Sequence, residues 1–259
     1  MTLSAIAILS GLSLFAQGTG EKEAALGRQM AADLGQRTTA IASRSVQEYV
    51  EKLGRRLASQ MPASPFRFTF SVIAEDSCPA IHEPYALPGG YVFVPSALFS
   101  AAQDEAEFAG MLAHAMAHVV ERHATRQATR GEPMQSMVFV PGCASGVAVP
   151  VGFLKIQRGL ELRADLLAVQ TMARAGFDPE ALARYTERVQ PRESATPAAL
   201  SLMPSRDERI ARIVSEIAKL PAADYATLTT SEFEAAREEV RRLLPSNRST
   251  PPSLMRKPA

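Results

Sequence analysis

Two histidines four residues apart, His114 and His118, constrain this chain of 259 residues more than any other feature. Side chains at positions i and i+4 of a helix project from the same face, one turn apart. Both imidazoles can therefore reach a single metal ion, and zinc is commonly bound by such His ligands. Because two His residues at this spacing are by themselves more often ordinary helix positions, the surrounding residues must decide between the two interpretations.

The residues around the pair indicate a partly buried helix. The acidic segment 104–107 suits a helix N-terminus, and the basic segment 122–130 suits a helix C-terminus. Between them, apolar side chains recur at helical spacing and predict a stripe that faces a core. They are Phe108, Met111, Leu112, Met116 and Val119. Three of the four His residues of the chain fall in this segment, which favours a metal-binding function.

A second segment supplies acidic residues of the kind that such a site needs. A zinc site with two His ligands takes a third protein ligand and keeps one position for water. Glu161 and Asp165 share one face of a helix predicted over 158–168. Glu161 could bind the metal, and Asp165 could accept a hydrogen bond from the far nitrogen of a ligand His. The alternative is a solvated acidic face paired with nearby arginines.

The residue after the first His departs from the zinc-peptidase pattern. In the motif H-E-x-x-H this residue is a Glu that serves as general base, and here it is Ala115. A methyl group can neither take a proton from metal-bound water nor return one to the leaving amine. General acid–base catalysis contributes about a hundred- to ten-thousand-fold in rate. Glu121 lies about two turns from His114 and is a poor substitute. We therefore expect zinc binding with negligible peptide hydrolysis.

Five motifs in order give the chain a resemblance to metallopeptidase family forty-eight, the zinc endopeptidases related to the CAAX prenyl protease and to bacterial membrane-quality-control proteases. The resemblance covers residues 20 to 215. The motifs are Leu87–Val94, the His114–His118 pair with Arg122 and His123 behind it, Glu161–Asp165, Ala175–Pro179 and Asp207–Ile210. The resemblance implies an α+β, mostly helical zincin-type domain with a small β-sheet. It also implies one zinc ion bound by His114, His118 and Glu161, with Asp165 behind a ligand, and polypeptide substrates such as misassembled envelope proteins.

The departures from the family pattern leave several interpretations open. Besides Ala115, Met203 and Pro204 stand where many relatives read His-Pro, and Glu83 stands where an Asn is frequent. Ala115 could be a deliberate Glu→Ala change that traps an inactive protease, or a natural feature of a pseudoenzyme. The competing functions are a non-catalytic protein that holds a polypeptide client in the same groove, and a structural module stabilised by zinc.

The ends of the chain suggest an exported protein. Residues 1–17 are apolar with a small-residue cleavage pattern, which is typical of a signal peptide, although a short N-terminal helix is the alternative. Export would place the peptidase-like domain, residues 18–244, in a bacterial periplasm or outside the cell. Cys78 and Cys143 could pair there. The segment 245–259 is rich in Pro and Ser, and we expect it to be disordered.

Helical periodicity and alternation predict the remaining elements. We expect helices over 21–35, 43–61, 179–189, 207–220 and 231–244, and strands over 65–73 and 91–94. A strand beside the active-site helix can bind an extended substrate by main-chain pairing. We expect Gly89, Gly90 and Tyr91 to contact substrate in this way, with a plain turn as the alternative.

One further segment and the charge balance bear on partners. Residues 137–154 are apolar and uncharged, but Pro and Gly residues interrupt them, which argues against a transmembrane helix. A loop over the active site, a contact with a membrane or a partner, and a buried connection all stay open. Lys and Arg total 28 against 27 Asp and Glu. The net charge of +1 gives no electrostatic reason to expect a nucleic-acid partner.

Overall fold

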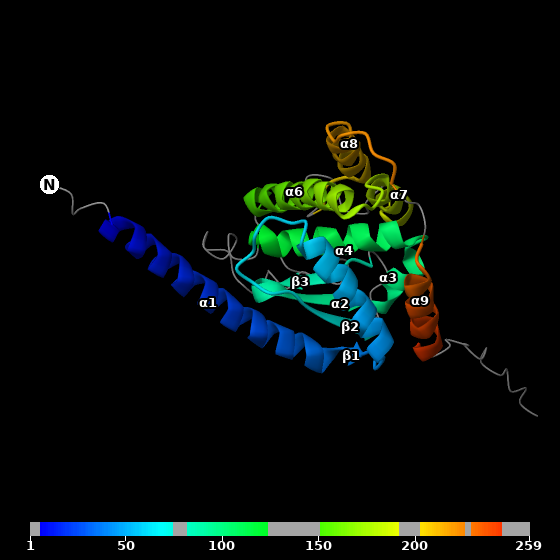
Figure 1. Cartoon of the computed structure of the whole chain (residues 1–259), viewed down its shortest axis with the longest axis horizontal. Helices are drawn as coiled ribbons and strands as arrows, with labels where there is room; N and C mark the ends of the chain where they lie inside the picture. The colour runs from blue at the N-terminus through cyan, green and yellow to red at the C-terminus, as the bar shows by residue number, and fades with distance from the viewer. Residues whose placement is uncertain (1–5, 75–81, 124–150, 192–202, 226–228, 245–259) are drawn as a thin grey trace, which may run out of the picture.

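The computed structural model describes residues 6–74, 82–123, 151–191, 203–225 and 229–244 (Figure 1). In these residues helices predominate over one four-stranded sheet, which confirms the predicted mostly helical α+β class. The strands are β1 (Thr39–Ala40), β2 (Thr69–Ala74), β3 (Tyr85–Leu87) and β4 (Tyr91–Pro95). Their order is β1-β2-β4-β3; the central pair β2 and β4 is parallel, and each outer strand is antiparallel to its neighbour.

The helices lie on both sides of this sheet. They are α1 (Ile6–Arg37), α2 (Arg44–Ala58), α3 (Ser96–Ala101), α4 (Glu105–Val120), α6 (Val151–Ala175), α7 (Glu180–Val189), α8 (Arg206–Ile217) and α9 (Ser231–Leu243), and a 3-10 turn, η1 (Pro88–Gly90), precedes β4. Figure 1 shows α4 and α6 stacked above the sheet and α1 running along its lower side. The long helix α1 contains the helix predicted over 21–35, and the helices predicted in the second half of the chain are confirmed within a few residues.

Alternation along the strands divides the core into two parts. Val92 and Val94 of β4 point into the main core, which they share with the apolar faces of α2 and α4. Phe93, between them, points to the opposite face, because successive side chains of a strand alternate. There it packs with Ile73 and Leu87 against the partly buried side chains of Met30, Ala31 and Leu34 of α1. The sheet is therefore covered on both faces, by α1 on one and by α2 and α4 on the other.

Two predicted boundaries are wrong, for reasons that local pattern does not contain. The strand predicted over 65–73 begins only at Thr69, the residue that pairs with Tyr91 at the start of β4. Before Tyr91 the neighbouring chain is in the η1 turn, so residues 65–68 have no strand partner there. The helix with the two His residues, α4, ends at Val120, where the basic segment was expected to continue it. His123 consequently lies just beyond the helix and not inside it.

Some predictions concern residues outside the described ranges. Cys78, Cys143, the tail 245–259 and residues 137–150 of the apolar segment belong to this group, and residues 151–154 form the start of α6. Residue 17 lies within α1, so the boundary of a signal peptide stays a prediction. No helix of the described residues has both the length and the apolar character that crossing a membrane requires.

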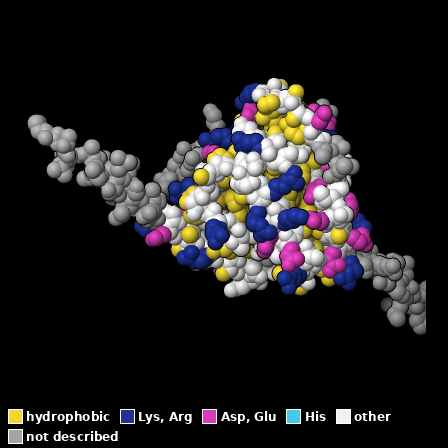
Figure 2. Space-filling model, viewed as in Figure 1, with side chains coloured by type: hydrophobic (Ala, Val, Ile, Leu, Met, Phe, Trp, Pro, Cys, Tyr) yellow, Lys and Arg dark blue, Asp and Glu magenta, His cyan; other side chains and the backbone are white. Residues whose placement is uncertain are grey.

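Charges of both signs are interspersed over the face shown in Figure 2, with apolar side chains between them. Several of these charges form exposed ion pairs, such as Lys52 with Glu232 across α2 and α9. Exposed pairs of this kind contribute little to stability. The charges that matter for the function are the buried ones described below.

Helix α1 can lie close to the η1 turn because Gly27 has no side chain. A Cβ atom placed there would be 1.8 Å from the carbonyl oxygen of Pro88. We expect Gly27→Ala to lower the free energy of unfolding by about 2 kcal/mol, because backbone atoms would have to move apart. Gly35→Ala in the same helix is the control, because nothing lies within 4 Å of that position. It should raise stability by up to about 1 kcal/mol through helix propensity. Urea unfolding of both variants measures the difference, and equal effects would contradict it.

Candidate metal centre

Helix α4 supplies the two His residues from within the core. Asp104 begins the helix, and its carboxylate accepts a hydrogen bond from the Glu107 backbone N–H at 2.8 Å. Almost every residue of α4 is buried, and α6 packs along it. Burial on most sides fixes the helix axis and rotation. The two imidazoles therefore have a defined direction toward α6.

Three side-chain atoms converge between α4 and α6. His114 Nε2 lies 3.2 Å from His118 Nε2 and 3.3 Å from Glu161 Oε2, and His118 Nε2 lies 3.4 Å from the same oxygen. Tetrahedral zinc with bonds of about 2.0–2.1 Å holds its donor atoms about 3.3 Å apart. The triangle therefore matches three corners of such a site. The sequence predicted this cluster, and the donor set fits a divalent metal ion.

The buried charges around this triangle are unbalanced without a cation. Glu161, Asp165 and Glu83 are buried carboxylates, and Arg209 is the one buried guanidinium that contacts this group among the described residues. With neutral imidazoles the group would carry an excess of two negative charges. Burying unpaired charge costs several kcal/mol. A divalent cation at the triangle would neutralise the excess.

In the absence of a metal, a proton on His114 offsets part of this negative charge. Burial disfavours the charged form of His114, but the charge and hydrogen bond of Asp165, together with Glu161, outweigh it and raise the pKa of His114 to about 10. Burial alone would raise the pKa of the Glu161 carboxyl, yet His118 and His114 hold it well below its ordinary value. The metal-free site is therefore a proton-binding site.

Asp165 and Arg209 orient the first ligand. Asp165 Oδ1 lies 2.8 Å from His114 Nδ1, the nitrogen that faces away from the triangle. This contact fixes the tautomer that leaves Nε2 free for a metal, as the sequence predicted. Arg209 of α8 holds Asp165 through two hydrogen bonds, Nε to Oδ2 at 2.9 Å and Nη2 to Oδ1 at 2.7 Å. Burial alone would raise the pKa of Asp165, but Arg209, followed by His114, lowers it.

Arg209 contacts Glu83 directly and is linked to Pro204 through Gln190. Glu83 is a position at which the sequence departs from the family pattern, and Pro204 directly follows a second such position, Met203. Arg209 Nη1 donates to Glu83 Oε1 at 3.3 Å and to Gln190 Oε1 at 3.1 Å. The Gln190 amide in turn donates to the carbonyl oxygen of Pro204 at 2.9 Å. The unusual Glu83 is thus a second partner of Arg209. Arg209 lay inside a recognised motif, but no local pattern indicated its function.

The second candidate ligand, His118, has a different neighbour, His123, to which the sequence alone assigns no function. His123, buried just after α4, places Nδ1 at 3.0 Å from His118 Nδ1. When His118 Nε2 faces a metal, His118 Nδ1 carries the ring proton and donates a hydrogen bond to Nδ1 of His123. His123 therefore orients His118 much as Asp165 orients His114.

Ala115 lies beside this centre and is 1% exposed. It belongs to the main apolar core, so a methyl group occupies the position of the general base in the H-E-x-x-H pattern. Glu121 caps the C-terminal end of α4, beyond His118. The three candidate ligands are thus present, whereas the residue after His114 is not the Glu of the H-E-x-x-H pattern.

The predicted substrate residues lie in tightly packed backbone. Gly89 and Gly90 both have positive φ angles, of 76° and 95°, which suit glycine. A Cβ atom at Gly89 would be 2.9 Å from Ala24 of α1, and one at Gly90 would be 2.3 Å from the Arg67 carbonyl oxygen. The close approach that they permit is to the chain itself. Tyr91 begins β4, an inner strand, and the edge strand beside it is β3. Substrate contact by these residues stays a prediction.

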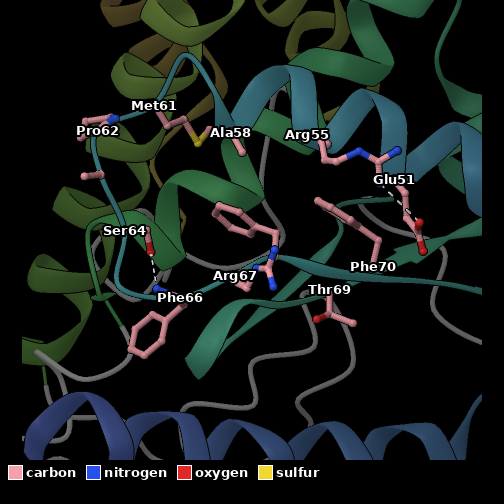
Figure 3. A pocket seen from close by; sticks show the side chains of 13 residues that line it. Glu51, Arg55, Ala58, Met61, Pro62, Ser64, Phe66, Arg67, Thr69 and Phe70 are labelled. Carbon is pink, nitrogen blue, oxygen red and sulfur yellow. Dashed lines mark hydrogen bonds and ion pairs between the residues drawn. The ribbon is translucent and has the colours of Figure 1, made fainter. Parts of the chain in front are cut away.

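A pocket of about 600 Å³ lies between the end of α2 and the start of β2 (Figure 3). Met61, Phe66 and Phe70 line it, with Arg55 and Arg67 at its sides. None of the three candidate ligands is among its lining residues. The pocket is therefore separate from the metal centre.

Fold and site together define a class. Two His residues on one helix, a Glu on a second helix and a carboxylate behind the first His are the arrangement of a mononuclear metallopeptidase centre. The family model of peptidase family M48 matches residues 40–217. This chain belongs to peptidase family M48. Members of this family are metal-dependent, so the comparison and the ligand triangle agree.

Relatives with assigned names fall into a bacterial and a mitochondrial group. The chain is 28% identical over 187 residues to the beta-barrel assembly-enhancing protease of Escherichia coli (strain K12), covering 63% of this chain and 37% of that protein. The protein of the same name from Yersinia pestis is 27% identical over 186 residues, with the same coverage. The mitochondrial metalloendopeptidase OMA1 of Schizosaccharomyces pombe is 27% identical over 176 residues, covering 64% of this chain and 51% of that protein. The chain thus spans about a third to a half of these relatives.

The raised pKa of His114 predicts that metal binding displaces a proton. Below about pH 10 the metal-free His114 is protonated, whereas a ligand imidazole is neutral. At pH 8 we expect about one proton released from His114 per ion bound, and metal affinity that rises as the pH increases. Calorimetric titration in two buffers with different ionisation enthalpies counts the protons. Zero release would show that His114 is neutral before binding.

Arg209 offers a test of the buried charge network. Arg209→Leu would leave Asp165 and Glu83 without their cation, and we expect a loss of about 3–5 kcal/mol in the free energy of unfolding. Arg212, exposed on the same helix, provides the matched control. Arg212→Leu should change stability by no more than about 0.5 kcal/mol. Denaturant unfolding in the presence of chelator compares the two; a tolerated Arg209→Leu would contradict the network.

Proposed function

We propose that this protein is a zinc-binding M48 metallopeptidase of the bacterial cell envelope that acts on polypeptides and whose hydrolytic chemistry is disabled at Ala115. The observation that carries the proposal is a complete ligand triangle beside a buried methyl group. Zinc is favoured because two imidazoles and one carboxylate in a tetrahedral arrangement suit it. The bacterial relatives, named as proteases that enhance beta-barrel assembly, support an envelope protein as substrate.

The described residues provide two of the four functions that peptide hydrolysis requires, and the metal ion provides a third. His114, His118 and Glu161 would hold the ion, and Asp165 and His123 keep the imidazoles in the required tautomers. When bound, zinc polarises the scissile carbonyl and lowers the pKa of a water molecule. Removing that proton and delivering it to the leaving nitrogen is the fourth function. Ala115 cannot perform it, so we expect very slow turnover.

A second candidate function is favoured by the same residue. A protein that keeps its metal and its fold but lacks the proton acceptor could hold a polypeptide client without cleaving it. In that case the metal would polarise a bound carbonyl or stabilise the fold. The chain would then bind unfolded polypeptide with the same affinity before and after long incubation, because no product would form.

Restoring the carboxylate separates these functions. We expect Ala115→Glu, with zinc supplied, to cleave an unfolded protein at least about a hundredfold faster than the original chain. Ala115→Gln is the matched control, because it has nearly the same volume as Glu and cannot accept the proton. Cleavage is followed by gel electrophoresis and mass spectrometry, with melting curves and zinc content measured for each variant because position 115 is buried.

Activity of Ala115→Glu alone, abolished by a chelator, would support the disabled peptidase. If both variants fold, bind zinc and fail to cleave, the client-binding function is favoured. Chelator-sensitive cleavage by the original chain would contradict the assignment of Ala115 as the inactivating residue.

A further inference from the structure

The end of the metal-binding helix contains a strained residue. Arg122 has a φ angle of 51°, and it is the one residue other than glycine with positive φ among those the structure describes. Helices commonly end with glycine in this conformation, because the Cβ atom of any other residue makes it unfavourable. A long side chain at such a position indicates that the side chain has a role that glycine could not perform.

The Arg122 side chain is held by the N-terminal helix α1. Its Nε and Nη2 both donate to Glu23 Oε2, at 2.8 and 2.5 Å. The Glu23 side chain is only 3% exposed, so the pair is shielded from water on the carboxylate side. The guanidinium also lies 5.9 Å from the centre of the Phe66 ring. The ion pair between Arg122 and Glu23 joins two segments that are 99 residues apart.

The position of Glu23 is itself fixed by packing. Gly27, four residues later on the same face of α1, allows the helix to touch the Pro88 carbonyl. Farther along, Met30 and Leu34 pack against the lower face of the sheet. With α1 held at these places, the short Glu23 side chain reaches Arg122. The carboxylate is thus presented by a rigid element.

The turn at Arg122 determines where His123 lies. In a continuing helix a residue five positions after His118 would point about 140° away from it. The left-handed turn at Arg122 instead returns His123 to His118, where the two Nδ1 atoms are 3.0 Å apart and the rings meet edge to face. Contact between the two imidazoles therefore depends on the conformation of Arg122.

We infer that Glu23 and Arg122 are positioning residues of the metal centre. Their ion pair holds the left-handed turn, the turn places His123, and His123 orients the ligand His118. Helix α1 is thereby part of the metal centre although it contributes no ligand. This inference rests on the proposed metal-binding function and deepens it.

Metal affinity tests the inference independently of peptidase activity. Glu23→Gln keeps the size of the side chain and removes its charge. Arg122→Ala removes the same ion pair and keeps a Cβ atom, which disfavours the left-handed turn. We expect Glu23→Gln and Arg122→Ala each to weaken Zn²⁺ binding about tenfold, the low end of the range for residues behind a ligand. The double variant should be no weaker than Arg122→Ala alone, because both changes break one interaction. Arg122→Gly also removes the ion pair, but glycine favours the turn by itself, so this variant should keep the affinity of the original chain.

Affinity is measured by competition with a chromophoric chelator at constant pH. The absorption spectrum of bound Co²⁺ reports the ligand geometry and should change in Glu23→Gln and in Arg122→Ala. Glu232→Gln breaks the exposed Lys52–Glu232 pair on another part of the surface and should leave both readings unchanged.

The outcomes separate the positioning role of Glu23 and Arg122 from metal binding itself. Weaker binding with an altered Co²⁺ spectrum in Glu23→Gln and Arg122→Ala, with the original affinity kept in Arg122→Gly, supports the inference. The original affinity and spectrum in Glu23→Gln and Arg122→Ala would overturn it while leaving the metal site intact. If the original chain binds neither Zn²⁺ nor Co²⁺, the proposed function and the inference fail together.

Discussion

The buried pair of Asp165 and Arg209 is the interaction on which the metal centre depends. It connects α6 to α8, and through His114 it reaches α4. Arg209 also contacts Glu83, just before β3, and Gln190, just after α7. Four separate segments, counting α8 itself, therefore meet at one guanidinium. A buried charge pair contributes little net stability, but losing one member is costly. The pair therefore acts mainly by fixing the geometry of the elements that carry the ligands.

The ligands could be predicted from the sequence because each depends on a local rule. His114 and His118 share a helix face by their spacing, and Glu161 and Asp165 do so on the next helix. The helices themselves could be predicted because α2 and α4 have clear apolar stripes. What could not be predicted depends on contacts between distant segments. No local pattern indicates that Arg209 contacts Asp165 or that Glu23 contacts Arg122. Nor does it indicate that β2 begins only where its partner strand β4 begins, at Tyr91.

The end of the metal-binding helix shows how such contacts override a local preference. A basic segment after Val120 favours continued helix, since positive charges stabilise a helix C-terminus. The chain instead turns at Arg122 into a conformation that glycine prefers. The ion pair with Glu23 and the packing of His123 against His118 offset the cost. Local sequence does not indicate this turn, because Glu23, the partner of Arg122, lies 99 positions earlier on another helix.

In the proposed function, ligand placement and proton transfer belong to different residues, so Ala115 is compatible with the observed triangle of candidate ligands. The candidate ligands are held by α4, α6 and the residues behind them, and the described contacts among these residues do not involve position 115. Ala115 contributes apolar packing to the core. A buried acid at this position would carry a desolvation cost that a methyl group does not. A methyl group here is therefore compatible with the fold and with the arrangement of the candidate ligands, and under the proposed function it is the one substitution that removes proton transfer.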